Sequence, residues 1–115
     1  LLEITFDGSI MIVKPAGPNV GQREAPIMKA DIDPVVKSAG KAMKVMVMDL
    51  SSVQFMSSMG LGMIIDMRNA AAQSGATAVL FGVNKDLKAL LAMMKIEKLY
   101  KIADTAAQLQ ALCGR

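Results

Sequence analysis

Histidine is absent from this sequence of 115 residues, and cysteine occurs only once. Without histidine the chain has no His-based catalytic triad, lacks the usual general base and lacks the commonest metal ligand. The single cysteine, Cys113, excludes an internal disulfide, argues against a zinc site and fits a reducing compartment. We therefore expect no metal centre and no cofactor, and the usual enzyme classes find little support.

Aromatic residues are also scarce, with three Phe, one Tyr and no Trp. Little is left for stacking on nucleobases and the net charge of +3 is mild, so no direct binding of nucleic acid is expected. The longest apolar stretches without a charge, residues 53–65 and 76–83, are shorter than the ~20 residues of a membrane helix. The first residues alternate like a strand and lack a basic region. We expect no membrane span, no signal peptide and a cytoplasmic location.

What the sequence does contain is enough apolar material for one core. The hydrophobic fraction is 53% and the charged fraction 20%, and the length suits one domain over residues 1–115 rather than two. Methionine is frequent, with 11 residues, and its adaptable side chain is expected mostly to fill the core.

Hydrophobic spacing and turn residues predict strands that alternate with helices. Strands are expected at residues 1–6, 9–14, 44–50, 77–83 and 99–102, with a short extended piece at 53–55. Helices are expected at 25–39 and 59–74, after Asn84, and after Asp104 as the cap of a last helix. This order predicts an α/β fold, with a mixed central sheet of about four to five strands and about four helices.

The helix expected at 25–39 contains Pro34, which removes a helical hydrogen bond and crowds the preceding turn. Two interpretations remain open here. Either the helix is interrupted at Pro34, or a second short helix starts there with Asp33 as its cap.

The helix expected at 59–74 is the clearest one, and its start contains residues suited to a functional site. Ser57 and Ser58 are both suitable N-caps, and free N–H groups at a helix start favour negative charge. Gly60 and Gly62 would allow another backbone to approach closely. On this helix Leu61 and Ile65 share a flank, which either touches a neighbouring helix or forms an exposed apolar patch for a partner.

Residues 45–62 resemble the signature of the STAS family, the fold of bacterial anti-sigma factor antagonists. In that signature a buried strand ends in Asp-Leu-Ser, here Asp49 to Ser51. A Phe-hydrophobic pair and then Asp-Ser-Ser-Gly-Leu-Gly follow, and here residues 55–62 read Phe-Met-Ser-Ser-Met-Gly-Leu-Gly. The similarity extends over essentially the whole chain and is strong from residue 45 to 112.

The resemblance implies a partner-switching regulator of transcription that is not an enzyme. Such an antagonist binds an anti-sigma factor that is also a Ser/Thr kinase, phosphorylation of one serine breaks the complex, and a phosphatase restores it. The matching serine is Ser58, with Ser57 as the second choice, and Asp49 is expected to support the site structurally. The partner-binding residues implied are Ser57, Met59, Gly60, Leu61, Gly62 and Ile65.

The sequence departs from the family pattern at two positions of this motif. Ser57 stands where antagonists usually have Asp, and Met59 stands where they often have Ser. Loss of the acid either removes a contact that the kinase needs or makes Ser57 itself a target.

Two alternatives keep the same fold. One is a scaffold that is not phosphorylated and that binds other STAS-like domains in a stress-signalling assembly, which predicts a homo-oligomer. The other is a module for a nucleotide or for lipid transport, although the glycines do not form Gly-x-Gly-x-x-Gly. A loose basic run is interpreted either as a solvated face or as a surface for an acidic partner. It contains Lys85, Lys88, Lys95, Lys98 and Lys101.

Overall fold

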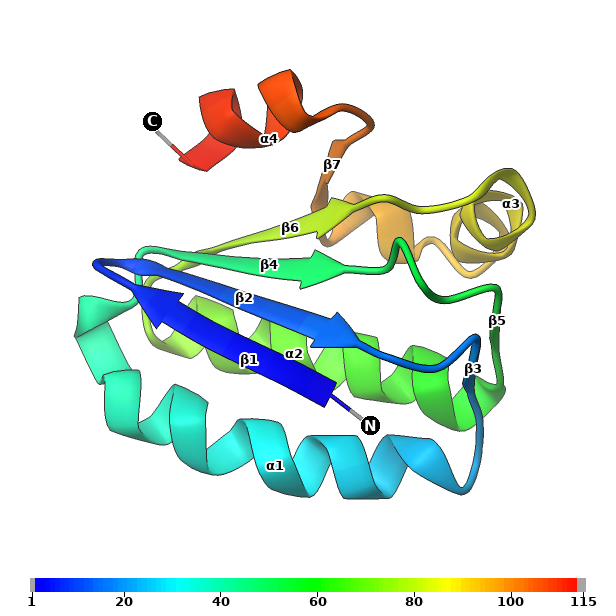
Figure 1. Cartoon of the computed structure of the whole chain (residues 1–115), viewed down its shortest axis with the longest axis horizontal. Coiled ribbons are helices and arrows are strands. Elements are labelled where there is room, and N and C mark those ends of the chain that lie inside the picture. The colour runs from blue at the N-terminus through cyan, green and yellow to red at the C-terminus, as the bar shows by residue number, and fades with distance from the viewer. Residues whose placement is uncertain (1, 114–115) are drawn as a thin grey trace.

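The computed structural model describes residues 2–113 as strands and helices in alternation (Figure 1). The strands are β1 (Leu2–Asp7), β2 (Ile10–Pro15), β3 (Asn19–Val20), β4 (Val45–Asp49), β5 (Phe55–Met56), β6 (Thr77–Phe81) and β7 (Lys101–Ala103). The α-helices are α1 (Glu24–Ala39), α2 (Ser58–Gln73), α3 (Lys85–Met93) and α4 (Ala106–Cys113), and two short 3-10 helices are η1 (Gly40–Ala42) and η2 (Ile96–Lys98).

Five strands form one mixed sheet in the order β1-β2-β4-β6-β7. The hairpin pair β1 and β2 is antiparallel, and every later neighbour is parallel. The expected fold class, with four α-helices and a mixed sheet of this size, is confirmed. β3 and β5 form a separate parallel pair that the sequence did not reveal.

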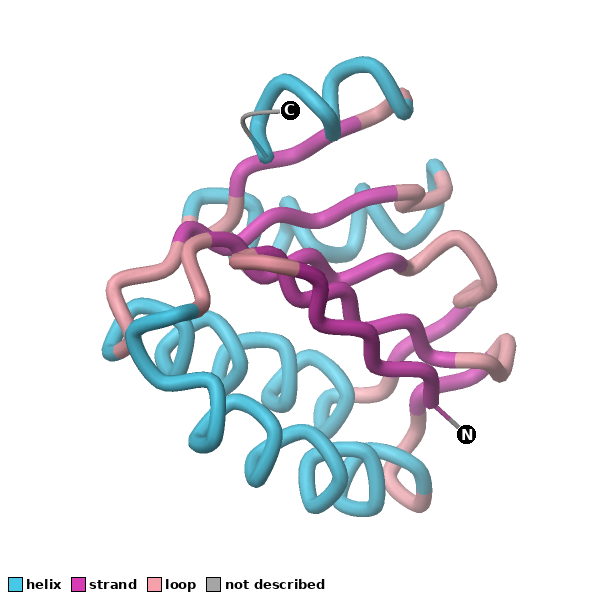
Figure 2. The backbone as a smooth tube through the Cα atoms, turned by 60° about the vertical axis from the view of Figure 1, so that its left-hand side comes forward, coloured by secondary structure: helices cyan, strands magenta, loops and turns pink. Residues whose placement is uncertain are grey.

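The sheet has a different cover on each face (Figure 2). The long helices α1 and α2 lie side by side against one face, and α4 lies on the other. Strand β4 shows how the sequence produces these layers. Met46 and Met48 belong to the large core beneath α1 and α2, while Val45 and Val47 belong to the smaller cluster on the α4 side. An unbroken apolar strand is what burial on both faces requires.

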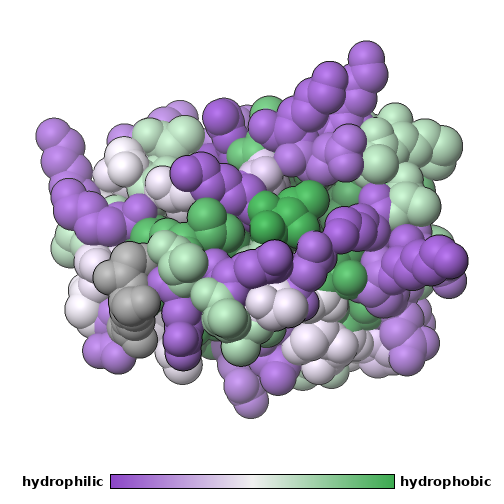
Figure 3. Space-filling view, turned by 90° about the horizontal axis from the view of Figure 1, so that it is seen from above, coloured by the Kyte–Doolittle hydropathy of each residue, from purple (hydrophilic) through white to green (hydrophobic). Residues whose placement is uncertain are grey.

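The members of the smaller cluster are buried, but the apolar side chains packed against them, Leu109 and Leu112 of α4 among them, are only partly buried. Figure 3 looks onto this face and shows apolar side chains at its centre, between hydrophilic ones. Eight of the eleven methionines are buried, as expected for core filler. They are Met11, Met28, Met43, Met46, Met48, Met56, Met63 and Met67.

Both interpretations of Pro34 are wrong, because α1 runs without interruption from Glu24 to Ala39. Ile32 and Val36 are buried on either side of the proline and fix the helix to the core. Pro34 and Ala30, whose carbonyl loses its helical donor, are exposed, so water can hydrate that carbonyl. The packing of Ile32 and Val36 thus outweighs the low helix propensity of Pro34.

The cap expected for the last helix is also wrong. Thr105, not Asp104, caps α4, because its Oγ1 accepts a hydrogen bond from the Gln108 N–H at 3.1 Å. The Gln108 side chain accepts in return from the Thr105 N–H at 3.2 Å. This reciprocal arrangement is a capping box. The cap expected at Asn84 is confirmed, since its Oδ1 accepts from the Leu87 N–H at 2.7 Å.

Candidate functional site

The start of α2 is fixed by Ser57, the residue just before the helix. Its Oγ accepts a hydrogen bond from the Gly60 N–H at 3.3 Å, and its own N–H donates to the Val20 carbonyl at 3.0 Å. Ser57 has extended backbone angles, as an N-cap does. The Ser57 hydroxyl is therefore engaged in holding the helix start, and its backbone is tied to β3.

Ser58 occupies a different environment although it is the next residue. It is the first residue of α2, it is exposed, and its hydroxyl makes no hydrogen bond within residues 2–113. The backbone N–H groups of a first helical turn have no partner within the helix and carry the positive end of the helix dipole. A negative group attached to Ser58 would thus be favoured locally while changing the charge of the surrounding surface.

Gly60 has the close backbone approach expected from the sequence, whereas Gly62 does not. A Cβ atom at Gly60 would collide with the carbonyl oxygen of Val20, so only glycine lets β3 run across the start of α2. A Cβ atom at Gly62 would meet nothing within 4 Å. Gly60 is buried and Gly62 is partly exposed, so only Gly62 can contact a partner from this surface.

The flank of α2 divides between core and surface. Leu61 is only 5% exposed and packs into the large core, so of the two alternatives left open for this flank, the exposed apolar patch does not hold at this residue. Ile65 is partly buried against the same core. A helical wheel alone leaves the environment of Leu61 open, because its burial depends on core residues from other elements.

Two other apolar side chains near the helix start are exposed instead. Met59 is 44% exposed and Phe55 is 56% exposed. Phe55 was not among the expected partner-binding residues. A signal for it existed in the sequence, because in an extended pair the side chains alternate and its neighbour Met56 is buried. Exposed large apolar side chains beside Ser58 are suited to contact a protein partner.

An open groove of about 390 Å³ lies beside this surface, between α1 and α2. Lys29 and Asp66 form an ion pair across it, with 3.4 Å between Nζ and Oδ2. Both side chains are well exposed, so the pair adds little to stability and can open for a partner. The groove is lined by Ala25, Pro26, Lys29, Met59, Gly62, Met63 and Asp66.

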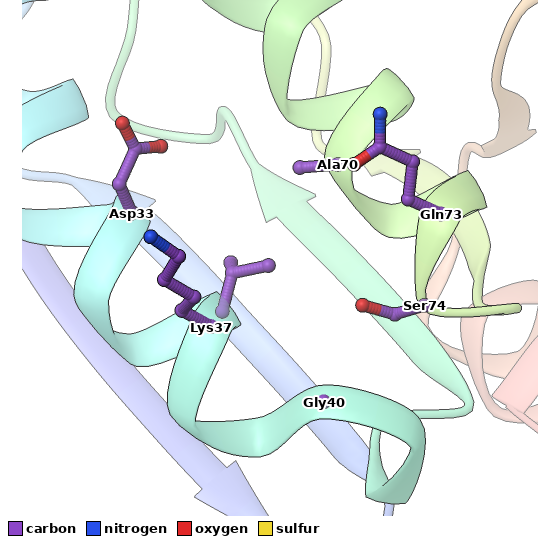
Figure 4. A pocket seen from close by; sticks show the side chains of 7 residues that line it. Asp33, Lys37, Gly40, Ala70, Gln73 and Ser74 are labelled. Atoms are coloured by element: carbon purple, nitrogen blue, oxygen red, sulfur yellow. The ribbon is translucent and has the colours of Figure 1, made fainter.

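A second groove lies at the opposite end of the same two helices (Figure 4). Asp33 and Lys37 project from α1, and Gln73 and Ser74 come from the end of α2. This groove is far from Ser58 along α2, because the two ends of a helix of 16 residues are separated by about 22 Å. It therefore does not belong to the surface around Ser58.

Asp49 holds the turn that follows β4. One of its carboxylate oxygens accepts hydrogen bonds from the Ser51 N–H at 3.0 Å and from the Ser51 hydroxyl at 2.6 Å. Further along the same loop, the Val53 carbonyl accepts a hydrogen bond from the Asn84 side chain at 3.2 Å. Asp49 and Asn84 thus shape the loop that leads to Phe55 and α2, and Asp49 makes no direct contact with Ser58 in this set of bonds.

Among residues 2–113, no group of three or more His, Cys, Asp or Glu side chains is placed to hold a metal ion. In the same part of the chain, no helix is both long and apolar enough to cross a membrane.

The arrangement of strand, serine-capped helix and flanking grooves can be compared with known families. The model of the STAS domain family matches residues 2–109. The chain belongs to the STAS domain family. The resemblance stated from the sequence is confirmed.

Solved STAS structures share this fold at low sequence identity. A candidate anti-sigma factor antagonist from Thermotoga maritima has a TM-score of 0.87 and 18% identity, over 99% of this chain and 95% of its own. The unphosphorylated form of the Bacillus anti-sigma factor antagonist SpoIIAA has a TM-score of 0.74 and 12% identity, over 100% of both chains. These identities establish similarity of fold.

The same fold also forms part of a much larger protein. The murine anion transporter Slc26a9 matches with a TM-score of 0.80 and 11% identity, over 96% of this chain but only 19% of the transporter. The same fold therefore occurs in proteins with different functions. The fold alone does not assign a function, which has to be argued from the site.

Proposed function

We propose that this chain is an anti-sigma factor antagonist-like regulator that acts by binding a protein partner and performs no catalysis. The surface at the start of α2 would bind an anti-sigma factor that is also a serine kinase, in the cytoplasm of a bacterium. The exposed contacts to this partner would come from Phe55, Ser58, Met59 and Gly62. Ser57, Gly60 and Leu61 act from below this surface by fixing its shape.

The observation that carries the proposal is the exposed, unbonded Ser58 hydroxyl at the first position of α2. A kinase needs access to a free hydroxyl, and Ser58 offers one while the neighbouring Ser57 hydroxyl is engaged with Gly60. A phosphate adds nearly two negative charges, which would disrupt contact between this apolar surface and a partner. Ser58 is therefore the proposed switch, and a phosphatase would reverse it.

This chain has Ser57 where the family usually has Asp, and this difference is compatible with Ser58 as the switch. A serine and an aspartate both serve as N-caps, so Ser57 keeps the geometry of the helix start. It removes one negative charge beside Ser58. The proposed phosphate on Ser58 would then be the main negative charge at this helix start, which makes the change on phosphorylation large.

Intact-mass spectrometry after incubation with ATP and the anti-sigma factor kinases of the same genome tests the switch. We expect the mass of one phosphate on the wild type and on Ser57→Ala, and none on Ser58→Ala. Ser38→Ala, which removes an exposed serine from α1, is the control and should behave like the wild type. Phosphate retained on Ser58→Ala would reject Ser58 as the switch.

A second candidate is a constitutive scaffold that binds other STAS-like domains. Phe55 and Met59 favour it, because they are exposed regardless of any modification. This candidate predicts no phosphate from any kinase and self-association in gel filtration, whereas the switch predicts a phosphate at Ser58.

A further inference from the structure

A pocket of about 250 Å³ lies at the opposite side of the chain from the proposed docking surface. It is formed where the C-terminal half of α2 meets β6 and the segment from η2 to β7. Arg68 lies ten residues after Ser58, which places it about 15 Å further along the helix axis. The pocket is thus separate from Ser58, and it shares no lining residue with either groove between α1 and α2.

The pocket gathers positive charge from three elements. Arg68 comes from α2, Lys98 from η2 and Lys101 from β7, and no Asp or Glu is among its lining residues. Within residues 2–113 neither lysine forms an ion pair. Three cations directed at one space repel each other, and an anion in that space would relieve the repulsion.

Arg68 is held in place before any ligand arrives. Its Nε donates a hydrogen bond to the Leu99 carbonyl at 3.3 Å, which spans α2 and the segment before β7. Its Nη1 also donates to the Asn69 Oδ1 at 3.4 Å. A guanidinium group fixed in this way loses little conformational freedom on binding and can present the N–H groups that these two bonds leave over to an anion. The Thr77 hydroxyl, which also lines the pocket, makes no hydrogen bond within the described residues and provides an uncharged donor.

We propose that this pocket binds the phosphate group of a small organic phosphate. Phosphate presents several oxygens in different directions, which suits donors that converge from α2, β6, η2 and β7, whereas a carboxylate presents two. The volume is below the range of drug-sized ligand sites, so the ligand is small. Three alanines, Ala72 among them, form the uncharged wall against which the carbon part of the ligand would lie.

The proposal does not depend on phosphorylation or partner switching, and its test measures binding directly. Amide shifts of the nitrogen-15-labelled chain are followed by NMR during titration with glycerol 3-phosphate and with inorganic pyrophosphate at constant ionic strength. We expect saturable shifts at Arg68, Thr77 and residues 98–101. Succinate, a dianion without phosphorus, should bind at least about tenfold more weakly.

Two double variants with the same change in charge supply the control. Lys98→Gln with Lys101→Gln should weaken phosphate binding by about tenfold or more, because charge-assisted contacts are lost. Lys14→Gln with Lys85→Gln removes two cations from the other end of the strands and should leave the affinity within about twofold. All four lysines are exposed or partly exposed, so both variants should fold, and a thermal melt verifies this.

The variant Arg68→Lys tests whether the pocket recognises the shape of phosphate or only attracts its negative charge. It keeps the positive charge but loses the fork that contacts two oxygens, so weaker binding of both phosphates is expected. Shifts that do not saturate, equal losses in the two double variants, or succinate bound as tightly as phosphate would each overturn the proposal.

Discussion

At the scale of single residues, one hydrogen bond from a backbone N–H gives Ser57 and Ser58 different environments. The sequence presents two adjacent serines that both suit a helix cap. In the structure the Gly60 N–H bonds to Ser57, and Ser58 is left exposed. Capping preferences alone cannot separate the two, because they depend on whether the helix begins at Ser58 or one residue later. Only the resemblance to the family motif placed Ser58 first.

The two glycines of the motif differ in the same way and give a matched pair of variants. Gly60→Ala places a methyl group against the Val20 carbonyl, so we expect a loss of about 1–3 kcal/mol in the free energy of unfolding, as for overpacking. Gly62→Ala meets open space in a helix, so a gain of about 0.5–1 kcal/mol is expected. Urea denaturation measures both, and equal effects of the two variants would reject the close approach of β3.

At the scale of elements, α1 provides a test of the continuous helix through Pro34. Proline costs about 3 kcal/mol relative to alanine in a helix interior, and part of this cost is offset by its stiffening of the unfolded chain. We expect Pro34→Ala to raise the free energy of unfolding by about 1–3 kcal/mol.

Lys37→Ala serves as the control for Pro34→Ala. It replaces an exposed residue of the same helix that already favours helix, and its effect should stay within about 0.5 kcal/mol. Thermal and chemical denaturation supply the values. A loss of stability in Pro34→Ala would indicate that the chain depends on a break at this position.

Helix α4 differs from the other three α-helices because none of its residues is buried. Thr105→Ala removes the cap hydrogen bond to Gln108, which is worth about 1 kcal/mol. We expect hydrogen exchange of the α4 amides to become about fivefold faster, while the midpoint of global unfolding hardly moves. Asp104→Ala is the control, since Asp104 does not cap α4 and its exposed ion pair with Lys88 adds little to stability. A large fall in global stability would show that α4 is part of the main folding unit.

The elements that the sequence predicted well are those with a strong local pattern. The strands around Val47 and Val79 and the helix closed by Gly75 have unbroken apolar runs or regular spacing. The β3–β5 pair was missed because each strand has two residues and its partner lies more than thirty residues away. The burial of Leu61 stayed open as well, because it depends on packing in a core whose members lie far apart in the sequence. Local patterns do not encode such contacts.

At the scale of the whole molecule, Tyr100 links two elements that are far apart in the sequence. Its hydroxyl donates to the Ile64 carbonyl at 2.6 Å, which joins the segment before β7 to α2. Burial raises the pKa of Tyr100 far above its usual value, and the charge of Arg68 opposes this only in part. The folded chain therefore holds the phenol proton more strongly than the unfolded chain does.

This difference in pKa sets the direction of the pH dependence. Because the folded pKa is raised, the contribution of Tyr100 to stability is complete below the unfolded value of 10.0 and is lost progressively above it. The chain has one tyrosine, so phenolate absorbance reports this residue alone. We expect no phenolate signal until the chain unfolds at alkaline pH. A normal titration near pH 10 in the folded chain would contradict the burial of Tyr100.

The fold also separates two surfaces with different chemistry. The start of α2 presents Ser58 beside the exposed apolar side chains of Phe55 and Met59. The C-terminal half of α2 contributes Arg68 to the basic pocket. A partner on the first surface would therefore leave the second one accessible.

Isothermal titration calorimetry with the anti-sigma factor of the same genome tests most directly whether the start of α2 is the docking surface. We expect the wild type and Ser58→Ala to bind with similar affinity, and Ser58→Glu to bind about tenfold or more weakly because a charge enters the apolar contact. Ser38→Glu, with the same charge on α1, should bind like the wild type. Equal affinities for all four proteins would contradict the assignment of the docking surface to the start of α2.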